Sequence, residues 1–427
     1  MGRISQNSAT NAWNVNVNNA NVNNNTKTNS NYVRSVADYE NRILGNSAID
    51  FEGVIKAYYE CRKKKRSSSN ELLYEVNAPR RIYLLWRELV TGKYEIGTSI
   101  AFIVNKPVKR EVFAATFKDR IVHHWIVLRL NPEFEKYLPR ECMSNRKGRG
   151  TSMAIRKVAY DIKACSENYT KECWIWKFDI QGMFMSIDKR LLNKRLQLFI
   201  DERYNKADKD ALKWLVEKVV MHCPQKNCRF RSDKSEWIGL APNKSLFNQD
   251  DYHGLAIGNL TSQLFANFFL APLIRFCKSL GIKYITEYVD DFTVVHTSKT
   301  ELLSFIPKVR EYLKNPLYMV LHPKKFYFQY FSKGVSFVGG IVKPHRVYSS
   351  KRTLRNGYLQ ILRVLYTRNL INLRNSVNSY FGYTKHHYEF KWRQQMASFI
   401  SKDTENIVFT QHYNSIKLTQ NTICLCA

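Results

Sequence analysis

Residues 281–298, GIKYITEYVDDFTVVHTS, decide the fold. Two runs of β-branched and aromatic residues flank the adjacent acids Asp290 and Asp291, which is the pattern of a β-hairpin with carboxylates at its tip. Like charges side by side on a buried element repel each other and are costly to desolvate, so a divalent cation would stabilise them. The alternative interpretation is that one of the acids only ends a strand or makes a turn.

Residues 174–187, WIWKFDIQGMFMSI, predict a buried strand that leads into a turn. Asp179, near the end of this strand, is a third acid, and carboxylate oxygens from separate strands together suit Mg²⁺. After the turn, Ser186 or Asp188 can cap a helix that contains KRLLNKRLQLFI. The two stretches therefore predict an oxygen-rich metal site.

The charge of the chain indicates a polyanionic partner. Lys and Arg number 67 against 36 Asp and Glu, a formal net charge of +31, which is far more than solubility requires and favours nucleic acid. We expect no membrane association and a cytoplasmic location, because no long apolar run or N-terminal signal is evident. The nine cysteines are odd in number and irregularly spaced, so they predict free thiols.

The 427 residues predict several packed regions. We expect a disordered Asn-rich tail over residues 1–37, because eleven of the residues 11–31 are Asn and cannot bury enough apolar area to offset chain entropy. Helical and β-type patterns alternate over residues 38–345, which predicts a mixed α+β domain. A helical domain is expected over residues 346–405 and a C-terminal tail over 406–427.

Several motifs in this order resemble those of the reverse transcriptase family. YVDD at 288–291 resembles its catalytic hairpin, FDIQGMF at 178–184 its first catalytic strand, FVGG at 337–340 its primer-grip turn, and DRIVHHWI at 119–126 part of its fingers. The resemblance covers roughly residues 85–400. It implies an α+β, right-hand polymerase fold with fingers, palm and helical thumb.

The resemblance also implies the site. Asp179 and Asp290 would bridge two Mg²⁺ ions, or Mn²⁺, with Asp291 assisting and Ile180 among the metal-binding residues. Arg110 would clamp the triphosphate, because a planar bidentate donor suits phosphate geometry. Phe184 would exclude a ribose 2′-hydroxyl, with a core Phe after a strand as the alternative interpretation. The residues expected to bind nucleotide are Lys109, Arg110, Phe184, Ile257, Gly258, Gln263 and Lys324.

Basic residues outside this pocket are expected to contact nucleic acid. A basic run follows aromatic residues in IKAYYECRKKKRSSS, although such a run is often only a solvated face. In LHPKKFYFQYF at 321–331, alternation predicts that Phe326, Phe328 and Tyr330 lie on one strand face as core. The predicted nucleic-acid-binding residues are Arg62, Lys63, Lys64, Arg146, Arg149, Gly339, Lys391 and Arg393.

One motif resembles a subgroup, the enzymes of diversity-generating retroelements. Residues 257–263 read IGNLTSQ where most of the family has Gln-Gly-x-x-x-Ser-Pro. A Gln in the nucleotide pocket can hydrogen-bond, whereas Ile257 supplies only shape. The resemblance implies error-prone copying of RNA into cDNA at template adenines for gene diversification. The Asn-rich segment also resembles the C-terminal phrase of diversified proteins, as the translation of an overlapping template repeat would.

Two other functions stay open. One is an antiphage-defence or retron-like reverse transcriptase that copies a partner non-coding RNA, and the other is an RNA-binding protein that lacks activity. The partners implied are template RNA, its cDNA, deoxynucleoside triphosphates and a small basic accessory protein in a ribonucleoprotein.

Overall fold

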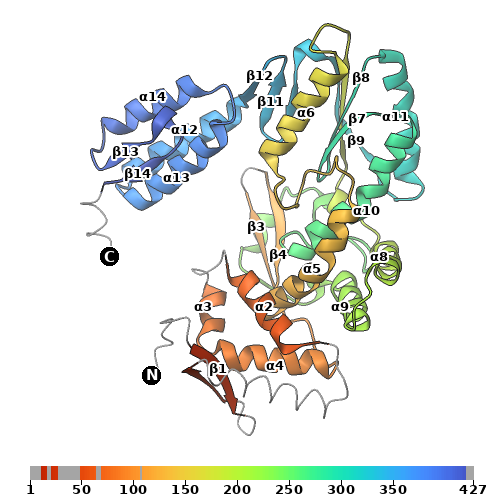
Figure 1. Ribbon diagram of the computed structural model, residues 1–427, viewed down its shortest axis with the longest axis vertical. Coiled ribbons are helices and arrows are strands. Elements are labelled where there is room, and N and C mark those ends of the chain that lie inside the picture. The colour runs from red at the N-terminus through yellow and green to blue at the C-terminus, as the bar shows by residue number, and fades with distance from the viewer. Residues whose placement is uncertain (1–10, 17–20, 27–48, 64–68, 106–107, 420–427) are drawn as a thin grey trace. The chain divides into compact units, whose positions relative to one another are not determined.

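The computed structural model describes residues 11–16, 21–26, 49–63, 69–105 and 108–419. Within them the chain mixes helices and sheets, which confirms the predicted α+β class (Figure 1). The chain divides into two compact units. The first unit comprises residues 1–138, 182–270 and 317–319, and the second comprises residues 139–181, 271–316 and 320–427.

Apart from an N-terminal pair of strands described below, the first unit is mainly helical around one three-stranded sheet. Strand β3 pairs antiparallel with β4 and parallel with β6, in the order β4-β3-β6. Helix α10 (Leu260–Ser279) begins here and ends in the second unit. The other elements are α2 (Phe51–Arg62), α3 (Ser69–Glu75), α4 (Ala78–Val90), β3 (Ser99–Val104), β4 (Arg110–Ala114), α5 (Phe117–Tyr137), α7 (Met183–Ser186), α8 (Lys189–Arg203), α9 (Lys209–Met221) and β6 (Cys228–Phe230).

The second unit is built on a four-stranded antiparallel sheet in the order β7-β8-β5-β9. The strands are β5 (Trp174–Ile180), β7 (Tyr284–Tyr288), β8 (Asp291–His296) and β9 (Leu321–Tyr330). The predicted hairpin is confirmed, because the run 281–298 forms β7 and β8. The predicted helix after β5 is α8, and Asp188 caps it by accepting the backbone N–H groups of Arg190 and Leu191 at 2.8 and 3.1 Å.

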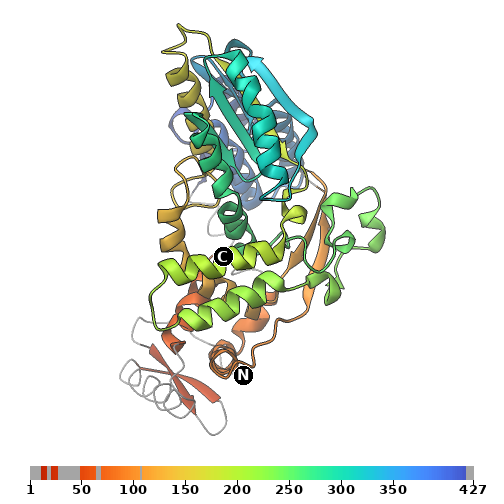
Figure 2. The same ribbon diagram turned by 90° about the vertical axis from the view of Figure 1, so that its right-hand side faces the viewer.

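Two helices cover this sheet. Helix α6 (Thr151–Cys165) packs Ile155, Val158 and Ile162 against Ile175 and Val295 in one buried cluster. Helix α11 (Lys299–Lys314) lies along the sheet on the side away from α6 (Figures 1 and 2). Alternation along the strands gives each helix an apolar set of side chains to cover.

The C-terminal part of the second unit is helical, as predicted, but it extends further than residue 405. A small sheet, β10 (Val335–Phe337), β11 (Gly340–Lys343) and β12 (Arg346–Ser349), precedes helices α12 (Lys351–Tyr366), α13 (Leu370–Thr384) and α14 (Phe390–Ser401). Strands β13 (Ile407–Phe409) and β14 (Ile416–Leu418) then pair, and Ile416 is buried in the helical core. Residues 407–418, which we expected in a tail, are therefore part of this helical unit because their apolar side chains close its core.

The N-terminal segment departs from our expectation of a wholly disordered tail. Strands β1 (Asn11–Asn16) and β2 (Asn21–Thr26) pair antiparallel with Val15 opposite Val22. Ala12, Trp13 and Val15 interrupt the Asn residues of β1, and Val22 and Thr26 those of β2. The rest of residues 1–37 lies outside the described residues.

Two further expectations concern apolar residues. Phe326 is 48% exposed and Phe328 and Tyr330 are only partly buried, so the prediction of a core face on β9 was wrong. The strand lies at the sheet edge, where aromatic rings keep one side open to solvent. Helix α10 is long and apolar enough to cross a membrane by composition, but 72% of that window is buried, as in the core helix of a folded domain.

Candidate active site

The tip of the β7–β8 hairpin is a two-residue turn made by Val289 and Asp290. Val289 has φ +62°, a conformation that such a turn usually assigns to glycine and that costs a β-branched residue about 1–3 kcal/mol. Two hydrogen bonds hold the turn, from the Val289 N–H to Ser144 Oγ at 3.2 Å and from the Ile180 N–H to the Asp290 carbonyl at 3.2 Å. The strained backbone therefore fixes Asp290 beside the end of β5.

Three carboxylates meet at this end of the sheet. Asp179 on β5 and Asp291 on β8 are direct cross-strand partners, and Asp290 precedes Asp291. Two lysines balance their charge. Lys325 Nζ lies 2.6 Å from Asp179 Oδ2, and Lys177 Nζ lies 3.2 Å from Asp291 Oδ1. The structure thus brings the predicted Asp179, Asp290 and Asp291 together.

The pKa values of the carboxylates at this site are shifted by burial and by their mutual negative charge. Burial, followed by the charges of Asp179 and Asp291, raises the pKa of Asp290 to about 6. Burial also raises the pKa of Asp291, although Lys177 opposes the change. For Lys325, burial lowers the pKa, but the hydrogen bond and charge of Asp179 outweigh burial and raise it overall. The cluster would therefore be stabilised by further positive charge.

A buried glutamate that the sequence did not single out lies directly behind the hairpin tip. Glu287 is 1% exposed, and burial raises its pKa to about 7. Its backbone N–H donates to the Glu141 carbonyl and its own carbonyl accepts the N–H of Met143, both at 3.0 Å. Ser144 Oγ lies 3.5 Å from its Oε1 and also accepts the Val289 N–H. Glu287 therefore ties the hairpin to the segment 141–144.

The donor chemistry of the cluster fits a hard divalent cation. Its ligands would be carboxylate oxygens, and two ammonium groups now occupy positions beside them. Ile180 has a fully buried side chain, so only its backbone carbonyl could serve as a ligand. Among the described residues, no three His, Cys, Asp or Glu side chains converge closely enough to enclose an ion as they stand.

The lysine that reaches the carboxylates is not the one predicted. We expected Lys324 in the pocket, but it is the ammonium group of Lys325 that contacts Asp179. Neighbouring residues on a strand point to opposite faces, so only one of the two can face the carboxylates. Phe326 lies opposite Phe178 in the register of β9 and β5, which sets Lys325 beside Asp179. This pairing joins strands that are far apart in the sequence, so no local sequence pattern predicts it.

The loop 254–259 in the first unit is mostly packing. Leu255 and Ala256 are buried, and Ile257 packs against the cluster around Phe113 and Met185. The Ile257 carbonyl accepts the N–H of Phe113 at 3.0 Å. The apolar first half of this motif is explained by its role as core of the first unit.

Only glycine fits at position 258, because β4 approaches its backbone closely. Its φ is +120°, and an added Cβ would lie 2.8 Å from Val112 Cγ1. Gln263 is exposed in the first turn of α10. Phe184 in α7 is partly exposed, so it is not the core residue of the alternative interpretation, and its carbonyl accepts the N–H of Leu255 at 2.8 Å.

The predicted triphosphate-binding residues are at the start of β4. Lys109 Nζ donates to the Ile238 carbonyl at 2.8 Å, whereas Arg110 is exposed and makes no ion pair within the described part of the chain. The next residue, Glu111, is 1% exposed and was missed by the sequence reasoning. Its carboxylate accepts three hydrogen bonds of 2.6 Å each, from Trp237 Nε1, Ser245 Oγ and the backbone N–H of Leu246.

Three of the predicted nucleic-acid-binding arginines are turned into the protein. Arg393 is 4% exposed and donates to the Thr384 carbonyl at 2.8 Å. Arg146 is 8% exposed and donates to the Pro139 carbonyl at 2.7 Å, and Arg149 donates to the Cys142 carbonyl at 3.1 Å. The predictions for Arg393 and Arg146 were wrong, because their guanidinium groups satisfy buried carbonyls. Arg149 is only partly buried, and its role stays a prediction.

The remaining basic residues differ in their surroundings. Arg62 forms an ion pair with Glu75, and Lys63 with Glu60. Lys391 is exposed on α14, and Lys64 lies outside the described residues. Gly339 has φ +88°, and a Cβ there would lie 2.8 Å from the Tyr383 hydroxyl, so this turn packs closely on α13.

Comparison with known proteins decides the family. Residues 107–342, more than half of the chain, match the family described as reverse transcriptase (RNA-dependent DNA polymerase). The chain belongs to the reverse transcriptase family. The matched region of this reverse transcriptase includes Asp179, Asp290 and Asp291, and membership confirms the predicted right-hand polymerase fold. No curated protein sequence matches the chain.

Solved structures of Candida telomerases are similar to this reverse transcriptase. An apo telomerase from Candida tropicalis, truncated of its C-terminal domain, is 13% identical, with coverage of 60% of this chain and 55% of that one and a TM-score of 0.43. Apo telomerase from the same species is 12% identical, covering 73% and 60%, with a TM-score of 0.46.

The telomerase from Candida albicans, in complex with a TWJ fragment of telomeric RNA, is 10% identical, covering 78% and 59%, with a TM-score of 0.45. Identities this low concern the fold alone. The chain spans 55% to 60% of the length of these three telomerase chains.

Proposed function

We propose that the protein is an RNA-directed DNA polymerase that makes cDNA from a cognate RNA. The observation that carries the proposal is the convergence of Asp179, Asp290 and Asp291 at one end of a sheet, in a chain of the reverse transcriptase family. Carboxylates held this closely are costly unless a cation is bound. Bound by Asp179, Asp290 and Asp291, Mg²⁺ would supply the Lewis-acid chemistry of phosphoryl transfer, and Mn²⁺ could replace it.

The chain's own residues contribute charge and position. Lys325, whose pKa is raised, keeps its proton at neutral pH and can neutralise negative charge next to Asp179. Lys177 does the same for Asp291. Arg110 is exposed and unpaired within the described residues, so its guanidinium is free to bind a triphosphate. Within the second unit, Lys177 and Lys325 would stabilise negative charge that develops beside the carboxylates during the reaction.

The specific role we propose is error-prone copying at template adenines for gene diversification. Ile257 packs into the core of the first unit and has no side-chain hydrogen-bonding group, so it cannot enforce the geometry of a base pair by polar contact. The proposed partners are template RNA, deoxynucleoside triphosphates and a basic accessory protein in a cytoplasmic ribonucleoprotein. The net charge of +31 supports an RNA partner.

The test is the error spectrum of the cDNA. The purified protein with its co-purifying RNA would be given deoxynucleoside triphosphates, and both the RNA and the cDNA would be sequenced. Errors concentrated opposite adenines support diversification. Faithful cDNA would contradict that role and favour the defence-type or retron-like function, and absence of any cDNA would contradict the polymerase itself.

A further inference from the structure

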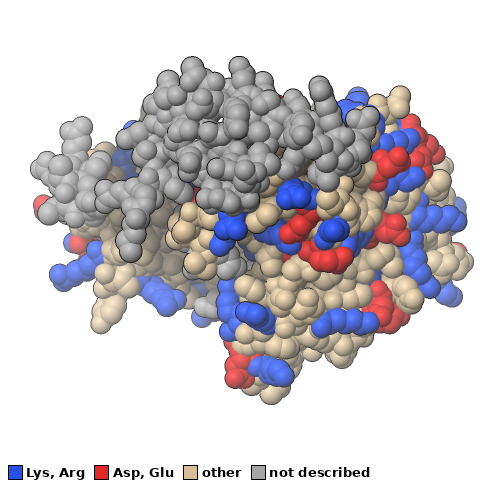
Figure 3. Space-filling view, turned by 90° about the horizontal axis from the view of Figure 1, so that it is seen from below, with Lys and Arg blue, Asp and Glu red and all other residues tan. Residues whose placement is uncertain are grey.

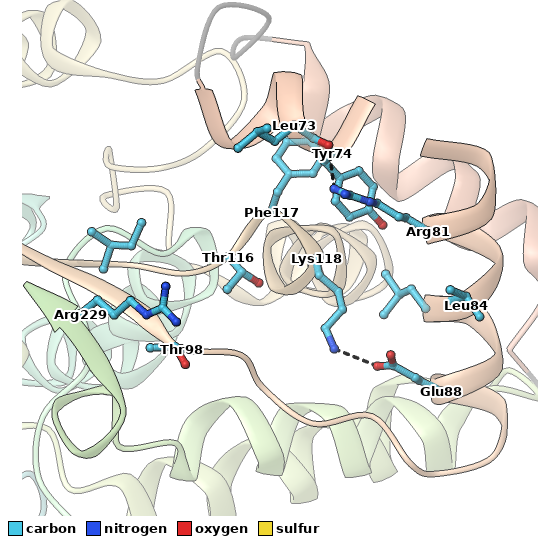
Figure 4. A pocket seen from close by; sticks show the side chains of 12 residues that line it. Leu73, Tyr74, Arg81, Leu84, Glu88, Thr98, Thr116, Phe117, Lys118 and Arg229 are labelled. Carbon is cyan, nitrogen blue, oxygen red and sulfur yellow. Dashed lines mark hydrogen bonds and ion pairs between the residues drawn. The ribbon is translucent and has the colours of Figure 1, made fainter. Parts of the chain in front are cut away.

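A pocket of about 580 Å³ lies within the first unit, and none of the residues predicted for metal, nucleotide or nucleic-acid binding lines it (Figure 4). Side chains from α3, α4, β3, the start of α5 and β6 form its walls. Pockets that hold small ligands measure roughly 300–1,000 Å³, so its volume suits a molecule the size of a nucleotide.

Two uncompensated cations flank this pocket. Lys118 is paired with Glu88 at 2.9 Å, so these two charges cancel. Arg81 donates to the neutral Leu73 carbonyl at 2.7 Å, and Arg229 is exposed with no hydrogen bond or ion pair from its side chain to the described residues. Arg81 and Arg229 lie on opposite sides of the pocket (Figure 4). An anionic ligand is therefore favoured, and guanidinium groups suit phosphate in particular.

Basic charge alone does not single out this place. Lys and Arg side chains are scattered over the described part of one face of the molecule, with acidic side chains among them (Figure 3). What distinguishes the pocket is that two cations without an acidic partner among the described residues, Arg81 and Arg229, lie beside an apolar hollow.

The wall between the cations is aromatic and aliphatic. The rings of Tyr74 and Phe117 pack with centroids 4.9 Å apart. Tyr74 is 6% exposed, and its hydroxyl is buried with no hydrogen-bond partner in the described part of the chain. Leu73 and Leu84 are 64% and 39% exposed. Such a wall favours a flat ring with a polar edge over a bare phosphate, since a buried hydroxyl without a partner is costly.

We propose that this pocket binds one unpaired nucleotide of a single-stranded RNA. The base packs mainly against the exposed Leu73 and Leu84, with the 6% and 4% exposed rings of Tyr74 and Phe117 behind them. Arg81 and Arg229 bind phosphates on the two sides of the nucleotide. An RNA strand fits better than a free nucleotide because a strand presents a phosphate on each side of the base.

The choice of RNA rests on the proposed function, because a reverse transcriptase must hold an RNA while it copies it. Packing of a base against apolar side chains tolerates any sequence, because every base has a flat apolar face. The pocket would therefore anchor RNA without selecting its sequence. A free nucleotide and an acidic peptide are the competing occupants, and the experiment separates them.

The experiment measures binding of a fluorescein-labelled single-stranded oligouridine by anisotropy at several KCl concentrations. The double variant Arg81→Ala, Arg229→Ala is expected to bind about tenfold more weakly at moderate salt. The slope of log affinity against log salt should become shallower by about 1.4, because each lost single-strand phosphate contact removes about 0.7. Leu84→Glu, which places a negative charge at the exposed rim, should weaken binding as well.

The matched control is Arg80→Ala, Arg87→Ala. It removes the same charge from α4, where both residues are exposed and line no part of the pocket. This control should change the affinity less than twofold. Because Arg229 is exposed and unpaired, Arg229→Ala alone guards against loss of fold in the double variant, and it should lose about half of the slope change.

Photo-crosslinking with 4-thiouridine in the same oligonucleotide adds a positional readout, with Tyr74 or Phe117 as the expected targets. Equal affinity of the pocket and control variants, or crosslinks only outside residues 69–118 and 228–230, would overturn the proposal. So would competition by free uridine monophosphate or by an acidic peptide at concentrations where an unlabelled oligouridine does not compete. None of these measurements needs polymerase activity. An inactive protein that still shows the predicted binding would therefore refute the proposed function and not the pocket.

Discussion

The hairpin tip of the second unit and the loop 254–263 of the first unit carry the two most specific motifs of the sequence, yet they are built in opposite ways. At the hairpin, polar groups are buried at a cost: Asp290 has a raised pKa, and Val289 has a left-handed backbone. In the loop, apolar residues are buried at a gain, and Ile257 packs into a small core. Burial of the hairpin's carboxylates destabilises the fold but supplies groups for the reaction. Burial of the loop's apolar residues stabilises the fold.

We expect the largest effect of a single substitution on catalysis at Lys325, in the hairpin's site. Lys325→Met should lower kcat about 100-fold, because it removes the ammonium group bound to Asp179 and leaves negative charge unbalanced. Lys324→Met, the matched control on the same strand, should change kcat less than threefold. Single-turnover primer extension on an RNA template measures both. A comparable loss at Lys324 would mean that the register of β9 does not govern the site.

The loop should be most sensitive at Gly258. Gly258→Ala should destabilise the protein by about 2–3 kcal/mol, because the new Cβ would meet Val112 and alanine disfavours φ +120°. Gly382→Ala is the control, since Gly382 lies within α13 and no atom lies within 4 Å of the added Cβ. That change should stabilise by about 0.5–1 kcal/mol. Denaturant unfolding measures both, and equal effects would contradict the close approach at Gly258.

The cost of burying Asp290 should appear in the pH dependence of stability. Its folded pKa of about 6 lies above its unfolded value, so the folded state binds more protons between roughly pH 4 and pH 6, and stability falls as pH rises through this range. Without divalent cations, Asp290→Asn should therefore be more stable than the unaltered protein by about 3 kcal/mol at pH 8, because each pKa unit corresponds to about 1.36 kcal/mol. The difference should disappear near pH 4. Thermal unfolding in EDTA tests this, and a variant less stable at pH 8 would contradict the assigned cost.

The smallest expected effect is at Ile257. Ile257→Gln supplies a polar group in place of a shape-only contact and should reduce misincorporation opposite adenine a few-fold, about 1 kcal/mol of discrimination. Ile257→Val keeps the apolar character and should leave the error rate within about twofold. Deep sequencing of cDNA from a defined RNA measures the difference. Equal error rates in the unaltered protein and in both variants would contradict a role of Ile257 in fidelity.

Local patterns predicted the elements that carry the catalytic acids. Alternating β-branched and aromatic runs predicted β5, β7 and β8, because the side-chain period of a strand is visible in a single segment. The residues themselves suggested that Asp179 joins Asp290 and Asp291 in a metal site, the family resemblance gave the three their catalytic roles, and the structure places them at one end of the sheet.

Features that depend on long-range packing escaped the sequence. Lys325 faces Asp179 because of the register of β9 against β5, which no local pattern contains. Arg146 and Arg393 look like any exposed basic residue in sequence but satisfy buried carbonyls. Glu287 lies inside an apolar run, which was the one available sign that it is buried, whereas Glu111 follows Lys109 and Arg110 and carries no such sign.

The most direct test of the central claim is primer extension on a defined RNA template by the unaltered protein and by the Asp290→Ala, Asp291→Ala form. Circular dichroism and melting would first establish that both are folded. The account predicts cDNA from the unaltered protein and a loss of at least about 1,000-fold in the variant. Equal cDNA synthesis by the two proteins would contradict the assignment of the catalytic site to this hairpin.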